Sequence, residues 1–373
     1  MGKQHLSNRK WQALTAIALI WLGLFACTKD KATEPQPEDP HVHSPVIFDP
    51  ALVPYDSLST YNLFEGVMAD QNPVYGVLPY ELINPLFTDY AHKYRFIWMP
   101  DSVSAHYNGD ENIFDFPDGT VLIKSFYYDH VQPNDETRIL ETRLLYRTNG
   151  IWHFANYVWN TDQTEATMDL NGSYVDLEWL DDNNQQRSAI YRIPSDAECL
   201  TCHKDENTSP IPIGPKPQNL NKDLFYTEGA KNQLQKWEEF GYISGGYPSN
   251  IETVADWGNT SLSLEDRVRG YLDINCAHCH SDDRHCSYRV PRFAWGESND
   301  TTLLGICVIP DEFPLPQYTH IVSRGNIARS VMHYRLNTTD ETVRMPLLGR
   351  TIIHDEAVQL IEQWITTLDP PCN

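Results

Sequence analysis

Two short cysteine and histidine motifs carry the most specific chemistry in the sequence. One reads Cys199-Leu-Thr-Cys202-His203 and the other Cys276-Ala-His-Cys279-His280, so both have the pattern C-x-x-C-H. In this pattern two thiols add to the two vinyl groups of one porphyrin, and the histidine that follows binds the iron on the proximal side. The sequence therefore predicts two covalently bound c-type hemes, one at each motif, with His203 and His280 as iron ligands.

Three other uses of these cysteines fit the spacing less well. A zinc site made of two cysteine pairs usually places the pairs about 15–20 residues apart, whereas Cys202 and Cys276 are much farther apart in this chain. A thioredoxin-like redox pair does not need a histidine after the second cysteine. A disulfide inside either C-x-x-C unit would be strained. Heme attachment is therefore the interpretation that accounts for both motifs.

Residues 1–27 have the features of an export signal. Lys3, Arg9 and Lys10 precede an apolar run, residues 11–26, that contains no charge. The stretch Leu24-Phe25-Ala26-Cys27 resembles the lipobox of bacterial lipoproteins, in which the cysteine becomes the lipidated first residue. We expect Cys27 to anchor the protein to a membrane of the bacterial cell envelope. Plain secretion and an uncleaved anchor helix are the alternatives.

A strongly acidic composition follows this signal. The chain has 28 basic and 51 acidic residues, and removal of residues 1–27 would leave 25 basic and 51 acidic residues, a net charge of −26. This charge argues against binding to nucleic acid and against electrostatic docking on anionic lipid. It favours solubility, or steering of a basic redox partner. Residues 28–45 are rich in Pro and charged residues, so we expect a flexible tether.

The remaining chain predicts an α+β fold. Residues 46–195 contain β-rich runs separated by Asp118-Gly119 and Asn149-Gly150, which are strong hairpin signals, so we expect a β-rich antiparallel domain. After it the pattern becomes mostly α-helical. Residues 196–258 form a first heme-binding segment, and residues 259–373 a second heme domain. In the latter, one helix begins near Ser263 and a final helix contains Trp364.

The segment from Ser261 to Leu368 resembles a class I cytochrome c domain. It has a helix, then C-x-x-C-H, a long loop, the sequence Arg344-Met345-Pro346, and a last helix. The resemblance implies that Met345 is the distal ligand of the iron held by His280, and that the last helix packs across the first. It also implies that the Gly214-Pro215 loop offers a proline carbonyl to the Nδ1–H of His203.

The first heme has no methionine at the corresponding spacing. Met99, which also precedes a proline, is the leading candidate for its distal ligand. An open sixth position is the alternative, and an open heme does chemistry as well as electron transfer. The other candidates are the methionine and histidine residues Met68, Met168, His92, His130, His153, His320 and His333.

From Tyr75 onward the chain resembles a bacterial family of exported diheme c-type cytochromes, uncharacterised in function. The resemblance rests on a combination of stretches: 78–90, 140–145, 157–160, 198–203, 232–234, 271–280 and 345–350. It implies a diheme electron carrier and no particular substrate. We expect a relay between redox protein partners. The alternatives are a diheme peroxidase-like enzyme with an open first heme, and a ligand-binding envelope protein with structural hemes.

Three cysteines remain after heme attachment and lipidation: Cys286, Cys307 and Cys372. In an oxidising compartment two of the three are expected to pair. Cys286 with Cys307 is the expected pair, which would leave Cys372 free.

Overall fold

The computed structural model describes residues 43–205 and 209–373 of the chain. The expected signal peptide with Cys27, and residues 28–42 of the expected tether, lie outside the described residues.

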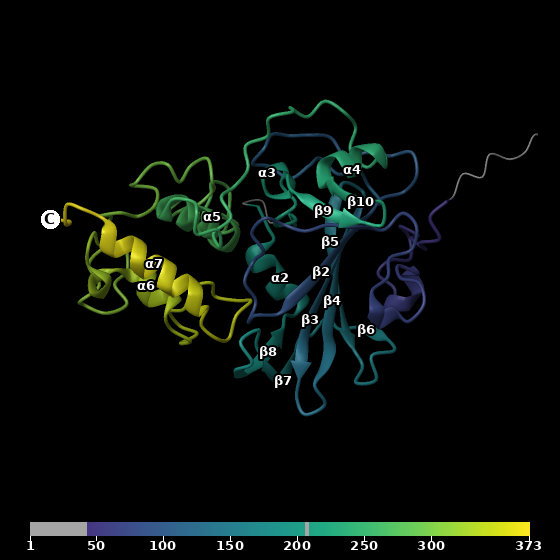
Figure 1. Cartoon of the computed structure of the whole chain (residues 1–373), viewed down its shortest axis with the longest axis horizontal. Coiled ribbons are helices and arrows are strands. Elements are labelled where there is room, and N and C mark those ends of the chain that lie inside the picture. The colour runs from purple at the N-terminus through teal and green to yellow at the C-terminus, as the bar shows by residue number, and fades with distance from the viewer. Residues whose placement is uncertain (1–42, 206–208) are drawn as a thin grey trace, which may run out of the picture. The chain divides into compact units, whose positions relative to one another are not determined.

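Eight antiparallel strands form one sheet in the first half of the described chain (Figure 1). Six strands follow one another in the order β1 to β6, and β7 pairs with the end of β3 and with β8. The bounds are β1 Leu78–Pro79, β2 His92–Trp98, β3 Val121–Val131, β4 Glu136–Thr148, β5 Ile151–Trp159, β6 Ala166–Met168, β7 Ser173–Leu180 and β8 Gln186–Ile193. A second, two-stranded sheet consists of β9 Asp223–Tyr226 and β10 Gly229–Asn232.

Two Gly-containing turns locate the central strands of the large sheet. Asn149 and Gly150 connect β4 to β5 with positive φ angles of 53° and 77°, as a two-residue hairpin turn requires. Gly119 lies just before β3 with φ 89°, and a Cβ there would come within 2.5 Å of Pro100. Glycine is therefore needed at this position for the chain to enter the sheet. The predicted strands next to both turns are confirmed.

Several helices, separated by long segments without helix or strand, follow β8 (Figure 1). The expectation of a mostly α-helical region is therefore met only in this coarser form. Ser263 caps the N-terminus of α5 by accepting a hydrogen bond from the Asp266 backbone N–H at 3.0 Å, which confirms the expected helix start. The helices are α2 Asp196–Cys202, α3 Pro217–Leu220, α4 Gln233–Glu239, α5 Leu264–Cys276, α6 Val331–Leu336 and α7 Asp355–Thr367, and the short 3-10 turns are Leu58–Tyr61, Met68–Asp70 and Ile327–Arg329.

Alternation along the strands gives the sheet two different faces. One face packs Val121, Ile123 and Leu144 into a core with the segment before β1, whereas Leu122 and Leu145 on the other face join a core with α3 and α4. A third core lies between α5, α6 and α7. The α+β prediction is confirmed in this form: an antiparallel N-terminal sheet is followed by a region with several helices. Within residues 43–205 and 209–373, no helix has the length and apolar character needed to cross a bilayer.

Candidate functional site

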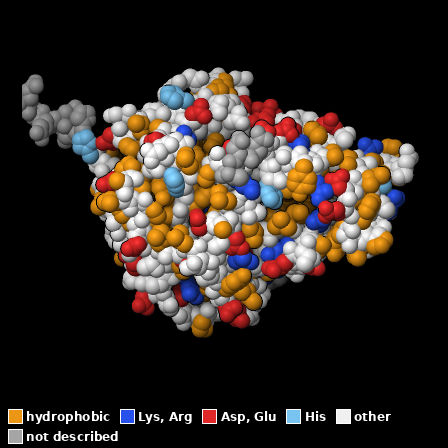
Figure 2. Space-filling view, turned by 180° about the vertical axis from the view of Figure 1, so that it is seen from behind, with side chains coloured by type: hydrophobic (Ala, Val, Ile, Leu, Met, Phe, Trp, Pro, Cys, Tyr) orange, Lys and Arg blue, Asp and Glu red, His pale blue; other side chains and the backbone are white. Residues whose placement is uncertain are grey.

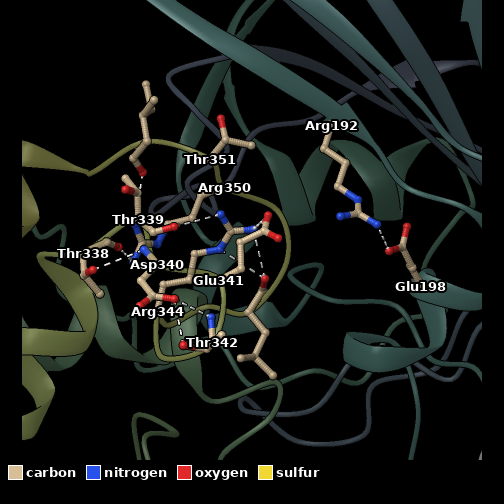
Figure 3. A network of polar contacts seen from close by, with 12 residues as sticks. Arg192, Glu198, Thr338, Thr339, Asp340, Glu341, Thr342, Arg344, Arg350 and Thr351 are labelled. Carbon is tan, nitrogen blue, oxygen red and sulfur yellow. Dashed lines mark hydrogen bonds and ion pairs between the residues drawn. The ribbon is translucent and has the colours of Figure 1, made fainter. Parts of the chain in front are cut away.

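The first C-x-x-C-H motif lies on α2, directly after the sheet. Ser195 and Glu198 form a capping box at the start of this helix, and Glu198 also pairs with Arg192 of β8 (Figure 3). Cys199 and Cys202 therefore lie on a helix that is fixed to the sheet by its first turn.

His203 directly follows this helix as its C-cap, and its side chain is partly buried. Its Nδ1 lies 2.9 Å from the carbonyl oxygen of Ile211, and its ring contacts that of Phe154 at a centroid distance of 5.3 Å. Burial, followed by the charge of Lys124, lowers the pKa of His203 to about 3. The imidazole is therefore neutral, and with Nδ1–H donated to the carbonyl, its Nε2 keeps the lone pair that an iron ligand needs. The prediction that the carbonyl of Pro215 accepts this hydrogen bond is wrong, because the chain turns back onto His203 earlier, at Ile211.

The second motif begins at the last residue of α5. His280 follows Cys276 in a turn in which the His280 N–H donates to the Cys276 carbonyl at 2.9 Å. Burial is the main reason that the pKa of His280 falls to about 4. Its Nδ1 is buried and has no hydrogen-bond partner within the described protein atoms. An orphaned buried nitrogen of this kind is uncommon and needs an explanation.

Each motif lines a cavity. The larger, which we call the Cys276 cavity, has a volume of about 330 Å³; the smaller, the Cys199 cavity, has about 120 Å³. Both are lined in part by Cys202, His278 and Pro346, so the two cavities adjoin. The Sγ atoms of Cys202 and Cys279 and one ring nitrogen of His278 all lie within 4.8 Å of one another. The fold therefore brings together two motifs that are distant in sequence.

The Cys276 cavity contains the residues that a heme site requires. Cys276, Cys279, His280 and Met345 all line it, together with Met332. Its volume falls within the range of about 300–1,000 Å³ that is usual for small-molecule and cofactor sites. The structure therefore places a second thioether, that of Met332, at the same cavity as Met345.

Met345 is held by its backbone on both sides. Its N–H donates to the Arg335 carbonyl at 2.9 Å, and its own carbonyl accepts from Nε of Arg350 at 3.0 Å. Arg350 and Arg344 are only 4% and 3% exposed, and Figure 3 shows both side chains reaching into the loop of residues 338–351. Asp89 fixes the end of this loop by accepting three hydrogen bonds from Thr351 and Ile352. The loop that carries Met345 is thus ordered by polar contacts made largely with backbone groups.

The Cys199 cavity has the attachment residues but a different wall. Cys199, Cys202 and His203 line it, and no methionine does so in the part of the chain that the structure describes. Met99 is 1% exposed and packs in the core that the sheet shares with α3 and α4. It does not line the Cys199 cavity, which corrects the expectation that Met99 is the distal ligand of the first heme. The donor set fits a heme, but the volume of about 120 Å³ means that wall side chains must move apart to admit a porphyrin.

Sequence reasoning missed a transverse row of polar side chains on the wall of this cavity. Arg95 of β2 is the Cα partner of Lys124 of β3, Lys124 is the partner of Arg143 of β4, and Arg143 is the partner of Asn156 of β5. All four residues line the Cys199 cavity, and we call them the polar row. A lysine inside the apolar run Val121-Leu-Ile-Lys-Ser-Phe126 is the one signal of this row that the sequence contains.

The remaining cysteines pair differently from the expectation. Cys307 and Cys372 form a disulfide, whereas Cys286 is free and lines the Cys276 cavity. The expected Cys286–Cys307 pair is therefore wrong. Cys372 follows α7, which returns the end of the chain to the segment that contains Cys307.

Searches with the chain found no matching family model, no matching curated protein and no matching solved structure. The assignment of the site therefore depends on its own residues and geometry.

Proposed function

We propose that this protein is a diheme c-type cytochrome that relays electrons between redox proteins in the bacterial cell envelope. The observation that carries the proposal is the convergence of two C-x-x-C-H motifs on adjoining cavities, with sulfur atoms of Cys202 and Cys279 within 4.8 Å. A c-type heme, when bound, supplies an iron that takes up and releases one electron. Attachment sites this close suit transfer of an electron from one site to the other inside one protein.

The chain's own residues have distinct roles in this proposal. His203 and His280 are kept neutral by burial, so each can offer a nitrogen lone pair to iron. Met345 offers a soft thioether sulfur in a loop that Arg350 holds in place. Apolar side chains such as Phe293 and Leu272 line the Cys276 cavity and exclude water, which favours the less charged, reduced state of a bound iron. The segment 259–373 acts here as a class I cytochrome c-like domain.

The location and partners form part of the same proposal. Cys27 is the lipid anchor, and the membrane is contacted through this anchor alone. The chain carries a formal charge of −23, and Figure 2 shows acidic side chains spread over both halves of the face drawn. A partner with a basic docking surface would therefore associate faster at low ionic strength than at high ionic strength.

A second candidate function is the binding of a metal ion between the two motifs. Cys202, His278 and Cys279 could hold a soft metal ion such as Zn²⁺ or Cu⁺ through two sulfurs and one nitrogen. The two proposals exclude each other, because thioether bonds to heme consume both thiols.

Heme content and metal content separate these two functions. Wild-type protein, denatured and analysed, should retain two hemes, because thioether bonds survive unfolding. The variant Cys199→Ala with Cys202→Ala should retain one heme, and so should Cys276→Ala with Cys279→Ala. Cys286→Ala is the matched control: it removes a thiol from the wall of the Cys276 cavity but outside both motifs, and should retain two hemes. Wild-type protein that contains zinc and no heme would refute the cytochrome proposal.

A further inference from the structure

The polar row places three cations side by side on one face of the sheet. Arg95, Lys124 and Arg143 occupy directly opposed positions on β2, β3 and β4, and neighbouring strands lie about 4.8 Å apart. Like charges directly opposite one another in a sheet are destabilising. A fold that keeps such a row needs a compensating negative charge.

The described protein compensates only one of these cations. The fully buried Glu141 pairs with Arg143 at 2.5 Å and also accepts a hydrogen bond from Tyr191. Between residues 43 and 373, apart from the undescribed 206–208, no carboxylate forms an ion pair with Arg95 or Lys124. Two cations at the wall of the Cys199 cavity are thus left without a carboxylate partner.

The fourth member of the row lacks a partner as well. Asn156 is 6% exposed, and both its Nδ2 and its Oδ1 are buried without a hydrogen bond inside the described protein. Leaving a buried amide unpaired is costly, and native structures rarely do so. Because Asn156 lines the same cavity as the three cations, a ligand in the cavity would supply the partner that Arg95, Lys124 and Asn156 lack.

We propose that the polar row binds an anionic oxygen group beside the first heme, and this rests on the proposed function. One source is a small free oxyanion such as nitrite; the other is a propionate of the heme itself. Cys199 lines the same small cavity as Lys124 and Arg143. In a c-type heme the thioether bonds and the propionates are on opposite edges of the porphyrin. Proximity to Cys199 therefore favours the free oxyanion.

The test uses purified full-length protein in which two hemes have been verified, with sodium nitrite as the probe. Nitrite should produce a saturable shift in the absorption of one ferric heme. Lys124→Leu and Asn156→Leu should each weaken nitrite binding about tenfold or more, since each removes a hydrogen bond to the anion. Arg147→Gln is the matched control, because Arg147 lies on the same sheet, pairs with Asp118 and does not line the cavity. It should leave nitrite affinity within about twofold.

A second arm distinguishes the two sources of the anion. If nitrite has no effect but Lys124→Leu and Asn156→Leu both lower the midpoint potential of one heme, and Arg147→Gln does not, the bound group is a propionate. The proposal is overturned if neither nitrite binding nor a potential responds to these variants. It is also overturned if Lys124→Leu makes a closed iron bind carbon monoxide, because Lys124 would then be an iron ligand. A wild-type protein without heme would refute the proposed function before any nitrite is added.

Discussion

Cys202 and Cys279 belong to different C-x-x-C-H motifs, yet their sulfur atoms lie within 4.8 Å of each other. The contact arises because α2 and the end of α5 present their motifs to adjoining cavities. Hydrogen bonding between the two groups, as free thiols, lowers the pKa of Cys202 and raises that of Cys279.

The first prediction follows from this contact. In protein produced without heme attachment, a mild oxidant that accepts two electrons should join Cys202 to Cys279 rather than Cys199 to Cys202. Peptide mapping by mass spectrometry under non-reducing conditions would detect the cross-link. Cys286→Ser should leave it unchanged, and a predominance of disulfides inside each motif would contradict the geometry.

The second prediction tests Met345 as the distal ligand of the second proposed heme, the one assigned to His280. Met345→Ala should lower the midpoint potential of one heme and let that iron bind carbon monoxide, because a thioether favours ferrous iron and occupies the sixth position. Heme attachment should remain intact. Met332 lines the same cavity, so Met332→Ala is the decisive comparison. If it produces these changes and Met345→Ala does not, Met332 is the ligand.

The third prediction assigns Arg350 a positioning role. Its guanidinium donates to the carbonyl oxygens of Met345, Ile352, Arg335 and Thr338 at 2.9–3.1 Å. Arg350→Lys keeps the charge but cannot reach four carbonyls, so the free energy of unfolding should fall by about 2–4 kcal/mol. Carbon monoxide binding should also increase at one heme, which a purely structural role would not cause. Arg187→Lys, at a partly exposed ion pair, is the control and should change neither property.

Local sequence patterns predicted the elements that carry the motifs. Asn149-Gly150 specifies a hairpin by its own backbone preferences, and Ser263 specifies a helix start through one side chain. Both signals act over a few residues, so they can be read without knowledge of the rest of the fold. Each C-x-x-C-H motif is likewise complete within a few consecutive residues and can be recognised without the rest of the fold.

Features that depend on distant contacts could not be predicted in this way. The polar row exists only because the registers of four strands align Arg95 with Asn156 across the sheet. The Cys307–Cys372 pair depends on where the chain runs after α7, and no local pattern encodes that path. The Ile211 carbonyl accepts the hydrogen bond from His203 because of the path of a single loop. The Gly214-Pro215 sequence did not predict that path.

The fourth prediction tests the disulfide. Cys307 and Cys372 are separated by 65 positions, so their cross-link restricts a long loop in the unfolded chain. Cys307→Ser and Cys372→Ser should each lower the free energy of unfolding by about 2–4 kcal/mol, measured by denaturant titration. Cys286→Ser should have a much smaller effect. If Cys286→Ser lowers the free energy of unfolding as much as Cys307→Ser does, the result would support a Cys286–Cys307 pair and contradict the structure.

The last prediction concerns His354, which precedes α7 and stacks on Phe87 at a centroid distance of 4.0 Å. Burial, followed by the charge of Lys93, lowers its pKa in the folded protein from 6.5 to about 3. Between these values the unfolded chain binds more protons than the folded one, so stability should fall as pH decreases below about 6.5. This residue alone should contribute a slope of up to about 1.4 kcal/mol per pH unit. His354→Phe keeps the stacking and removes the titration. The difference in unfolding free energy between wild type and variant should therefore change with pH between 6.5 and 4. A pH-independent difference for His354→Phe would show that this imidazole is not kept neutral by the fold.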